Sequence, residues 1–252
     1  MSAPAVQLCH VTYTYPDGQT ALRDVSFQLE EGESVAVIGG NGAGKSTLLL
    51  HLNGFLAPQR GSVHVGGLQV ARETMVPVRR AVGMVFQNPD DQLFMSTVRD
   101  DVAFGPTNMG LPPGEIEQRV HAALDTVGAT HLQARPPHRL SGGEKRSVAI
   151  AGVLAMSPSI LVLDEPSDGL DPAARRRLIN LLRRFTHTRL IATHDLDLVL
   201  DVCSRVLVLR QGQVEADGSP EVVFNDVALL QRCQLEQPLG WQSRPPPPCQ
   251  RG

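Results

Sequence analysis

Gly39-Gly40-Asn41-Gly42-Ala43-Gly44-Lys45-Ser46-Thr47 is the stretch that decides how this chain folds. It matches the phosphate-binding pattern G-x-x-x-x-G-K-(S/T). One apolar run, residues 34–38, precedes it, and another, residues 48–52, follows it. A buried strand, a glycine-rich turn and the start of a helix therefore come in the order that this motif requires.

The residue types of this turn suit a polyphosphate. Its glycines let consecutive backbone N–H groups point at one anion, and the helix after Gly44 adds the positive end of its dipole. Lys45 is expected to reach the β- and γ-phosphates, and the Ser46 hydroxyl to ligate Mg²⁺. The alternative, a purely structural glycine turn, does not account for the strand-turn-helix setting. The sequence thus predicts a nucleoside triphosphate site at Gly39, Asn41, Gly42, Ala43, Gly44, Lys45, Ser46 and Thr47.

Composition narrows the classes of protein to consider. With 252 residues the chain is long enough for one elaborate domain, and 42% hydrophobic residues is ordinary for a globular protein. A net charge of -3 gives no basic excess, so bulk charge does not favour a nucleic-acid partner. No apolar run approaches the length of a membrane span, and residues 1–4 lack the pattern of a signal peptide.

The four cysteines are widely scattered along the chain, at Cys9, Cys203, Cys233 and Cys249. They show neither C-x-x-C spacing nor the density of a disulfide scaffold. Reduced thiols, as in a cytosolic protein, are therefore expected.

The order of apolar runs and turns divides the chain into four segments. Short strands are expected within Val6–Phe27, broken by a turn at residues 16–18, and a helical pattern occupies Glu115–Val127. Periodicity is lost from about residue 234. The expected segments are a β subdomain with the first part of a nucleotide-binding core (1–87), an inserted helical subdomain (88–156), the remainder of the core (157–233) and a proline-rich tail without ordered structure (234–252).

A second strand supplies two adjacent carboxylates. The apolar run 159–163 ends in Asp164 and Glu165. Asp164 at the strand end is expected to hold Mg²⁺ through water, and Glu165 to orient and deprotonate an attacking water. The alternative, two surface acids that end a strand, is the weaker interpretation downstream of a phosphate loop. Mg-assisted phosphoryl transfer is therefore predicted.

These motifs together resemble those of the ATP-binding cassette (ABC) ATPases, the motor subunits of membrane transporters. The similarity runs from about Val6 to Phe224 and includes the Leu-Ser-Gly-Gly signature of the family at residues 140–143. It implies an α/β fold: a RecA-like P-loop core with an N-terminal antiparallel β subdomain and an inserted α-helical subdomain. It also implies ATP hydrolysis with ATP and Mg²⁺.

The resemblance assigns further roles by motif. It implies that Tyr15 stacks on adenine, that Gln87 senses Mg²⁺ and the partner, that residues 167–171 bridge two protomers, and that His194 contacts the γ-phosphate. An ordinary strand aromatic remains the alternative for Tyr15. A strand-end histidine satisfied by the backbone is the alternative for His194.

One chain carries two phosphate-binding elements, and both need the same γ-phosphate. The resemblance implies a head-to-tail solution: Ser141, Gly142 and Gly143 of one protomer cover the ATP held on Lys45 of another. A homodimer completed by ATP is expected, although a pair of different chains stays open. Glu144 stands where many members have glutamine, and Ser167 and Asp168 also differ from the residues most common in the family at those positions. None of these removes a residue that the chemistry needs.

The stretches 85–94, 97–106 and 140–146 resemble the ATPases of energy-coupling-factor importers, particularly the cobalt/nickel type. This implies an integral membrane coupling protein and a substrate-capture membrane protein as partners, and a peripheral location at the cytoplasmic face of the cell membrane. Cobalt or nickel is the expected cargo, with biotin or another vitamin as the alternative.

Gln92, Leu93, Phe94 and Met95 are expected to offer an apolar and amide groove to a partner's amphipathic helix. The alternative is that Leu93 and Phe94 belong to the core of the helical subdomain.

Two rival functions remain to be weighed. Soluble cassette ATPases that act on DNA carry coiled-coil insertions, yet sustained heptads are missing between the phosphate loop and the signature. Those that act on ribosomes carry two cassettes in one chain. A metabolic kinase would not need residues 140–143.

Overall fold

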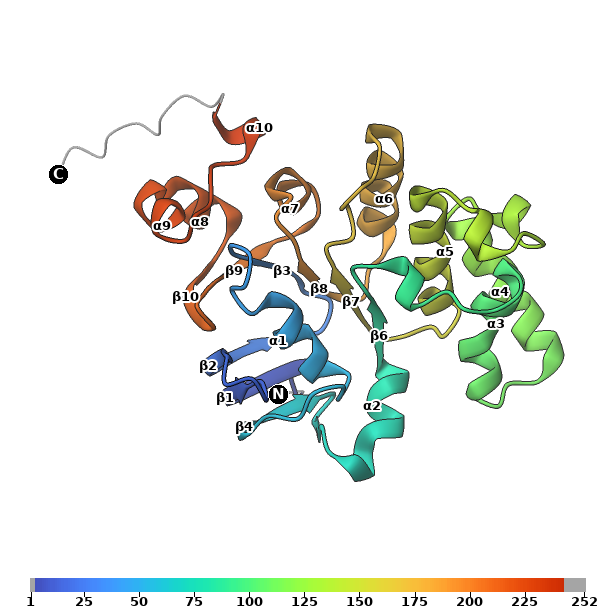
Figure 1. Ribbon diagram of the computed structural model, residues 1–252, viewed down its shortest axis with the longest axis horizontal. Coiled ribbons are helices and arrows are strands. Elements are labelled where there is room, and N and C mark those ends of the chain that lie inside the picture. The colour runs from blue at the N-terminus through green and yellow to red at the C-terminus, as the bar shows by residue number, and fades with distance from the viewer. Residues whose placement is uncertain (1–2, 243–252) are drawn as a thin grey trace.

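Two β-sheets and the helices that cover them make up the structure (Figure 1). The computed structural model of the chain describes residues 3–242. A six-stranded sheet has the order β10-β9-β3-β8-β7-β6, and a four-stranded sheet has the order β2-β1-β4-β5. The predicted α/β fold, with a P-loop core, an antiparallel N-terminal sheet and a group of helices, is confirmed.

Five strands of the larger sheet run parallel, and the sixth, β10, pairs antiparallel with β9. A turn at Gln211-Gly212 joins these last two strands as a hairpin. The strands of this sheet are β3 (Ser34–Ile38), β6 (Val82–Val85), β7 (Ile160–Asp164), β8 (Thr188–Ala192), β9 (Arg205–Arg210) and β10 (Gln213–Gly218).

The parallel strands read as continuous apolar runs because both faces of their sheet are covered. In β3, Val35 and Val37 contribute to one core cluster and Ala36 and Ile38 to the other. This alternation follows from the two-residue repeat of a strand. The sheet is thus a rigid central layer whose edges are free to carry loops.

One face of the large sheet packs on the small sheet and on the helix after the phosphate loop. The turn expected at residues 16–18 is present, and Gly18 N–H donates to the Tyr15 carbonyl at 2.9 Å. The elements of this layer are β1 (Val6–Thr14), β2 (Thr20–Leu29), α1 (Lys45–Leu52), β4 (Arg60–Val65), β5 (Leu68–Gln69) and α2 (Met75–Ala81).

The opposite face is covered by helices from the second half of the chain, drawn in orange and red in Figure 1. These are α6 (Pro172–Arg184), α7 (Leu196–Val202), α8 (Pro220–Asn225), α9 (Val227–Arg232) and α10 (Leu239–Gln242). Single 3₁₀ turns occupy Arg72–Thr74, Pro89–Asp91, Thr130–Leu132 and Pro137–Arg139.

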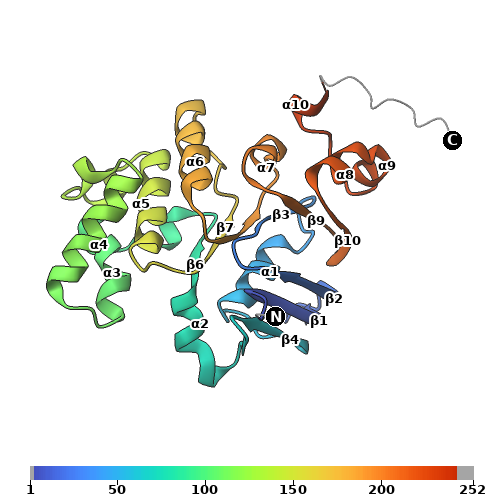
Figure 2. The ribbon, with the colours of Figure 1, turned by 180° about the vertical axis from the view of Figure 1, so that it is seen from behind.

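Three further helices lie beyond β6 at one end of the molecule (Figure 2). They are α3 (Val98–Asn108), α4 (Pro113–Thr126) and α5 (Gly142–Leu154), and they enclose a core of their own. Pro106 lies inside the last turn of α3 rather than ending it, since only one N–H is lost there. α5 also contributes Ile150 and Val153 to the core beneath α6, so it joins this group to the large sheet. The predicted segment boundaries stay a prediction.

The expected loss of order from residue 234 is wrong for residues 234–242. Leu235 packs against the core, and Trp241, only 6% exposed, contacts Phe224 and donates to the Asn225 side chain at 3.0 Å. A four-residue helix is too short to show a periodic pattern, and one buried indole holds it in place. Residues 243–252, with the proline run, lie outside the described residues. Within residues 3–242, no helix is both long and apolar enough to cross a membrane.

Candidate functional site

Four loops that follow strands of the large sheet meet at one edge. β3, β8, β7 and β6 are parallel neighbours in that order, so their carboxyl ends lie side by side. The loops after them carry Lys45, His194, Glu165 and Gln87. This edge is where open α/β sheets bind their ligands.

The turn before α1 has the geometry that its glycines permit. Gly42 and Gly44 have φ values of +75° and +106°, which disfavour other residues. A Cβ on Gly44 would lie 2.5 Å from the Ala21 carbonyl oxygen, whereas a Cβ on Gly42 would meet nothing within 4 Å. The loop is thus closely packed on its inner side and open on its outer side, as a phosphate cradle requires.

Lys45 lies within this cradle. Only 8% of the residue is exposed, and Nζ donates to the carbonyls of Gly39 at 2.9 Å and Gly40 at 3.4 Å. Nζ also lies 3.7 Å from Oε1 of Glu165. These contacts hold a buried positive charge at the loop, next to the carboxylate predicted to act on water.

A cleft of about 240 Å³ opens at the loop. The Tyr15 hydroxyl lies 3.0 Å from the Thr47 hydroxyl, and the Tyr15 ring meets Tyr13 edge to face at 5.0 Å. Gln19 and Ala21 also line the cleft, although sequence reasoning missed them. Gln19 ends the turn after Tyr15 and Ala21 lies in the strand that follows, so their closeness to Tyr15 was the available signal. The lining residues are Tyr15, Gln19, Ala21, Asn41, Gly42, Ala43, Gly44, Lys45, Ser46, Thr47, Gln87 and Glu165.

Glu165 is held by the neighbouring strand end. Its backbone is in the left-handed region, with φ +44°, and its N–H donates to the Ala192 carbonyl at 2.8 Å. Its Oε2 accepts the backbone N–H of His194 at 3.1 Å and lies 2.8 Å from Nδ1 of the same histidine. The His194 side chain is 63% exposed, so its ring extends from this contact toward solvent. The sequence predicted both residues but not their direct contact.

Asp164 has an oxygen that needs a partner. The residue is 5% exposed, and Oδ1 has no hydrogen-bond partner among residues 3–242. Burial raises the pKa of its carboxyl, while a hydrogen bond from the Ser46 side chain acts in the opposite direction. An orphaned carboxylate oxygen beside a hydroxyl fits a hard cation such as Mg²⁺. Residues 3–242 contain no cluster of three His, Cys, Asp or Glu side chains that could hold a metal.

The signature residues lie apart from this cleft. Ser141 caps α5: its Oγ accepts the Glu144 N–H at 3.3 Å, and a Glu144 carboxylate oxygen accepts the Ser141 N–H at 2.7 Å. That N–H holds the pKa of Glu144 below its usual range. Ser141 and Gly142 are exposed. The chain therefore brings Tyr15, residues 41–47, Gln87 and Glu165 together, but not Ser141, Gly142 and Gly143.

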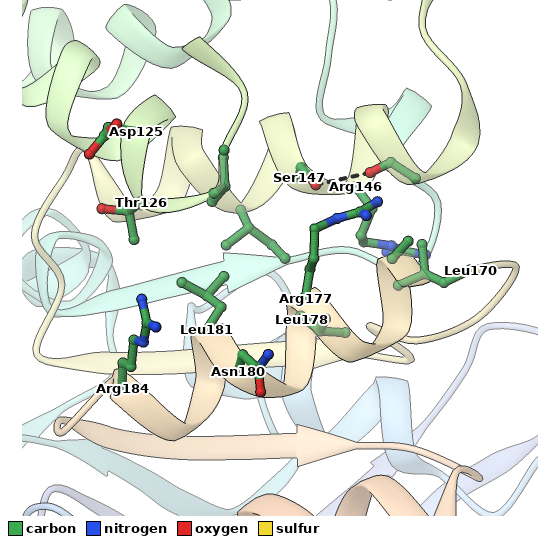
Figure 3. A pocket seen from close by; sticks show the side chains of 15 residues that line it. Asp125, Thr126, Arg146, Ser147, Leu170, Arg177, Leu178, Asn180, Leu181 and Arg184 are labelled. Carbon is green, nitrogen blue, oxygen red and sulfur yellow. Dashed lines mark hydrogen bonds between the residues drawn. The ribbon is translucent and has the colours of Figure 1, made fainter. Parts of the chain in front are cut away.

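A larger cavity, about 550 Å³, separates α6 from α5 and the end of α4 (Figure 3). Arg177 and Arg184 project into it from α6, and Ser147 faces it from α5. Of the residues predicted to bind the nucleotide, Gly143 lines this cavity, and Leu170 of the predicted bridging stretch lines it as well. The smaller cleft at Lys45, where most of the predicted residues converge, is therefore the candidate nucleotide site.

The surface at residues 92–95 matches only in part the groove that was predicted to receive a partner's helix. Phe94 is 62% exposed and packs edge to face on Phe104, which is 43% exposed. Leu93, in contrast, packs on the helical core, so the expectation that it faces a partner is wrong. The Gln92 amide also points inward, because its Oε1 accepts the Phe86 N–H at 3.4 Å and its Nε2 donates to the Ala149 carbonyl at 3.1 Å.

One buried carboxylate fixes the exposed part of this surface. Oδ1 of Asp101 accepts the N–H groups of Phe94 and Met95, each at 3.0 Å. Burial raises the pKa of Asp101, and these two hydrogen bonds act against that shift. The exposed surface is therefore Phe94, Met95 and Phe104, which we call the aromatic patch.

Comparison with known proteins identifies the family of the chain. The model of the ABC transporter family matches residues 22–168. The chain is 60% identical to a putative ABC transporter ATP-binding protein, GSU1281, of Geobacter sulfurreducens, covering 97% of this chain and 98% of that protein. It is 49% identical to the energy-coupling factor transporter ATP-binding protein EcfA of Methanothermobacter thermautotrophicus, covering 92% and 76%.

Solved structures show the same fold. CbiO1 from Clostridium perfringens, part of the ABC transporter complex CbiONQ, has a TM-score of 0.80 at 40% identity and covers 91% of this chain and 94% of its own. A dimeric structure of the ATP-binding cassette MJ0796 with ADP and phosphate has a TM-score of 0.78 at 28% identity, covering 85% and 98%. The matched range includes the phosphate loop, Gln87, the signature and Glu165. The chain belongs to the ABC transporter family, as an ATPase that binds and hydrolyses ATP.

Proposed function

We propose that this ATPase is the motor subunit of an energy-coupling-factor importer and works as a pair of cassettes at the cytoplasmic face of the cell membrane. The observation that carries the importer assignment is the aromatic patch beside the Gln87 segment, because apolar rings exposed so fully call for a partner. The likeness to EcfA and to CbiO1 supports the same assignment.

In the proposed site, the nucleotide lies in the cleft of the phosphate loop. Lys45 contributes its charge to the β- and γ-phosphates, and the open outer side of Gly42 gives them room. Tyr15, fixed by Thr47 and by the Tyr13 ring, provides an aromatic face for adenine at the rim.

Mg²⁺ fits beside Ser46, Asp164 and Gln87, where it would neutralise charge on the phosphates. The Ser46 hydroxyl and the unpartnered Asp164 oxygen are the protein ligands that the site offers, Asp164 acting through water. Gln87, exposed at the end of β6, is placed to complete this set when the cleft closes.

Glu165 is the proposed general base for the attacking water. Its two carboxylate oxygens contact Lys45 on one side and His194 on the other, so the orientation of the carboxylate is fixed. With the Nδ1 proton of His194 donated to Glu165, the outer edge of the exposed ring remains available to a γ-phosphate.

The second half of the site comes from another copy. Ser141 and Gly142 are exposed at the start of α5, with N–H groups and the helix dipole directed outward. We infer that they cover the ATP held by Lys45 of a second protomer, as a dimer of identical chains. The dimeric MJ0796 cassette supports this arrangement.

The expected cargo is cobalt or nickel ions, with a vitamin such as biotin as the second candidate. An integral membrane coupling protein docks a helix on the aromatic patch, and a separate membrane protein captures the substrate. Closure of the ATPase pair then moves the docked helix, since α3 carries Phe104 and its N-terminal Asp101 holds Phe94.

Purification of the tagged chain from its native membranes, combined with uptake of labelled Co²⁺, Ni²⁺ and biotin, tests this function. We expect integral membrane proteins to co-purify and Phe94→Asp to abolish both co-purification and uptake, while ATP hydrolysis by the isolated subunit stays within about twofold. Val222→Asp, at an apolar side chain that is 68% exposed on α8, is the matched control and should leave uptake intact. Normal uptake with Phe94→Asp would contradict the docking role.

A further inference from the structure

Side chains from two elements fasten α5 to the segment that contains Gln87. Arg146, in the second turn of α5, donates from Nη1 to the Phe86 carbonyl at 2.8 Å and from Nη2 to the Gln87 carbonyl at 2.6 Å. The residue is 4% exposed. One guanidinium therefore binds the two successive carbonyls that follow β6. The second of them belongs to Gln87, the residue predicted to sense Mg²⁺.

Two further contacts reinforce this connection. Gln92 bridges the Phe86 N–H and the Ala149 carbonyl of α5, and Lys145 of α5 lies 2.6 Å from Asp90. Residues 86–92 are thus bound at three places to residues 145–149 of α5, over little more than one turn of helix. We call this set of contacts the α5 strap.

The other side of α5 is not packed in the same way. The cavity of about 550 Å³ lies between α5 and α6, with Arg146 and Leu170 at one end and Asp125 and Arg184 at the other (Figure 3). Part of the boundary between α5 and α6 is therefore unfilled, although Ile150 and Val153 pack in the core beneath α6, whereas residues 86–92 are hydrogen-bonded directly to α5. The strap makes α5 and the Gln87 segment one mechanical unit.

The chemistry of Arg146 suits this task better than packing alone. A planar guanidinium donates to two acceptors in a fixed fork, which a lysine cannot reproduce. Its burial is costly: Nε has no hydrogen-bond partner among the described residues, and desolvation lowers the pKa of the guanidinium. A buried charge with an unsatisfied donor is tolerated where its remaining contacts have a function.

The two ends of this unit belong to different ATP sites. The start of α5 carries Ser141, which in the proposed dimer covers the ATP of the second copy, whereas Gln87 lines the cleft of its own chain. We propose that Arg146 is a positioning residue that couples the two ATP sites, because it moves Gln87 whenever the start of α5 closes on the other copy. This inference rests on the proposed dimer and on the proposed role of Gln87.

A double-mutant cycle on the purified ATPase tests it, with Arg146→Met, Gln87→Ala and the pair. We expect Arg146→Met to lower kcat about tenfold, to raise the Mg²⁺ concentration needed for half-maximal rate, and to reduce the Hill coefficient for ATP to about 1, with ATP affinity within about twofold. In the Gln87→Ala background, Arg146→Met should have almost no further effect. Arg177→Met, on the opposite wall of the same cavity, is the matched control and should behave as the unmodified protein.

Additive losses in the double variant, or an unchanged Hill coefficient and Mg²⁺ dependence in Arg146→Met, would overturn the inference. If Arg146→Met unfolds at the assay temperature, Arg146→Lys decides the matter: it keeps the charge but not the fork, and it should show the same loss of cooperativity to a smaller degree. An unaffected Gln87→Ala enzyme would instead contradict the proposed role of Gln87. Loss in Gln87→Ala with a normal Arg146→Met contradicts the coupling alone.

Discussion

The two predicted anion-binding elements of this chain are built in opposite ways. The phosphate loop holds a buried Lys45, bound to its own carbonyls, and opens into a lined cleft. The signature start of α5 is exposed, and the hydroxyl and N–H of its Ser141 pair with Glu144 of the same turn. The first element is preformed for its ligand, whereas the second lacks a surface to close against. The difference suits the proposed dimer, in which one chain supplies a complete phosphate cradle and its signature residues cover the nucleotide bound by the other copy.

Removing the charge from the preformed element has the largest expected effect. Lys45→Ala leaves the phosphates without their buried cation, so ATP affinity should fall by about 100-fold or more. Isothermal titration with ATP measures this loss. Ser141→Ala should change the affinity of the single subunit less than about twofold, because Ser141 lies outside the cleft. Equal losses in both variants would erase the distinction between the two elements.

A change in charge at the exposed element should have a moderate effect of the opposite sign. Glu144→Gln removes a carboxylate at the helix start to which a phosphate is proposed to bind, while glutamine still completes the cap. ATP-driven dimerisation should tighten about two- to fivefold at low salt, and the gain should shrink in 0.5 M salt. Sedimentation velocity at two salt concentrations checks it. Weaker dimerisation in Glu144→Gln would show that the carboxylate supports the closed state.

The smallest effect concerns pH and the support beneath the phosphate loop. His51 of α1 is fully buried, with Nδ1 2.7 Å from the Thr47 carbonyl and Nε2 without a partner in the described residues. Burial lowers its pKa below the usual 6.5, and the hydrogen bond to Thr47 offsets part of that shift. The unfolded state therefore binds a proton first, so stability is present above pH 6.5 and is lost as the pH falls through the lowered pKa.

Tm measured between pH 7.5 and 5 should consequently fall by a few degrees more than in His51→Gln, which has no imidazole to protonate. Parallel pH profiles for the two proteins would show that His51 does not contribute. Hydrogen exchange should locate this loss of stability in α1, which follows the phosphate loop, and not in α5, which begins with the signature. This result would sharpen the contrast between the two elements.

Local spacing was enough to predict much of this molecule. The apolar runs predicted the parallel strands, because apolar and polar residues do not alternate in a strand that is buried on both faces. The glycines before Lys45 predicted the turn. The loops that carry Gln87, Glu165 and His194 were predicted for the same reason: each follows a buried strand. Spacing along the chain, however, does not reveal contacts between loops, so the Glu165–His194 contact and the α5 strap were found only in three dimensions.

The errors have the same origin. Gln92 and Leu93 belong to a polar-apolar stretch that looks equally exposed in sequence, yet a bridging amide and one leucine turn inward while Phe94 turns outward. Trp241 is a single buried residue without a periodic neighbour, so no pattern pointed to the order of residues 234–242. Tertiary packing, not local propensity, decides such positions.

The most direct test of the composite site is the mass of the hydrolysis-deficient protein with and without ATP. Glu165→Gln should retain ATP binding and lose turnover by about 10²- to 10⁴-fold, because the general base is gone. Light scattering should then find single subunits without nucleotide and a dimer with ATP and Mg²⁺, and Ser141→Arg in the same background should restore single subunits. Single subunits at saturating ATP, or a dimer indifferent to Ser141→Arg, would contradict the account.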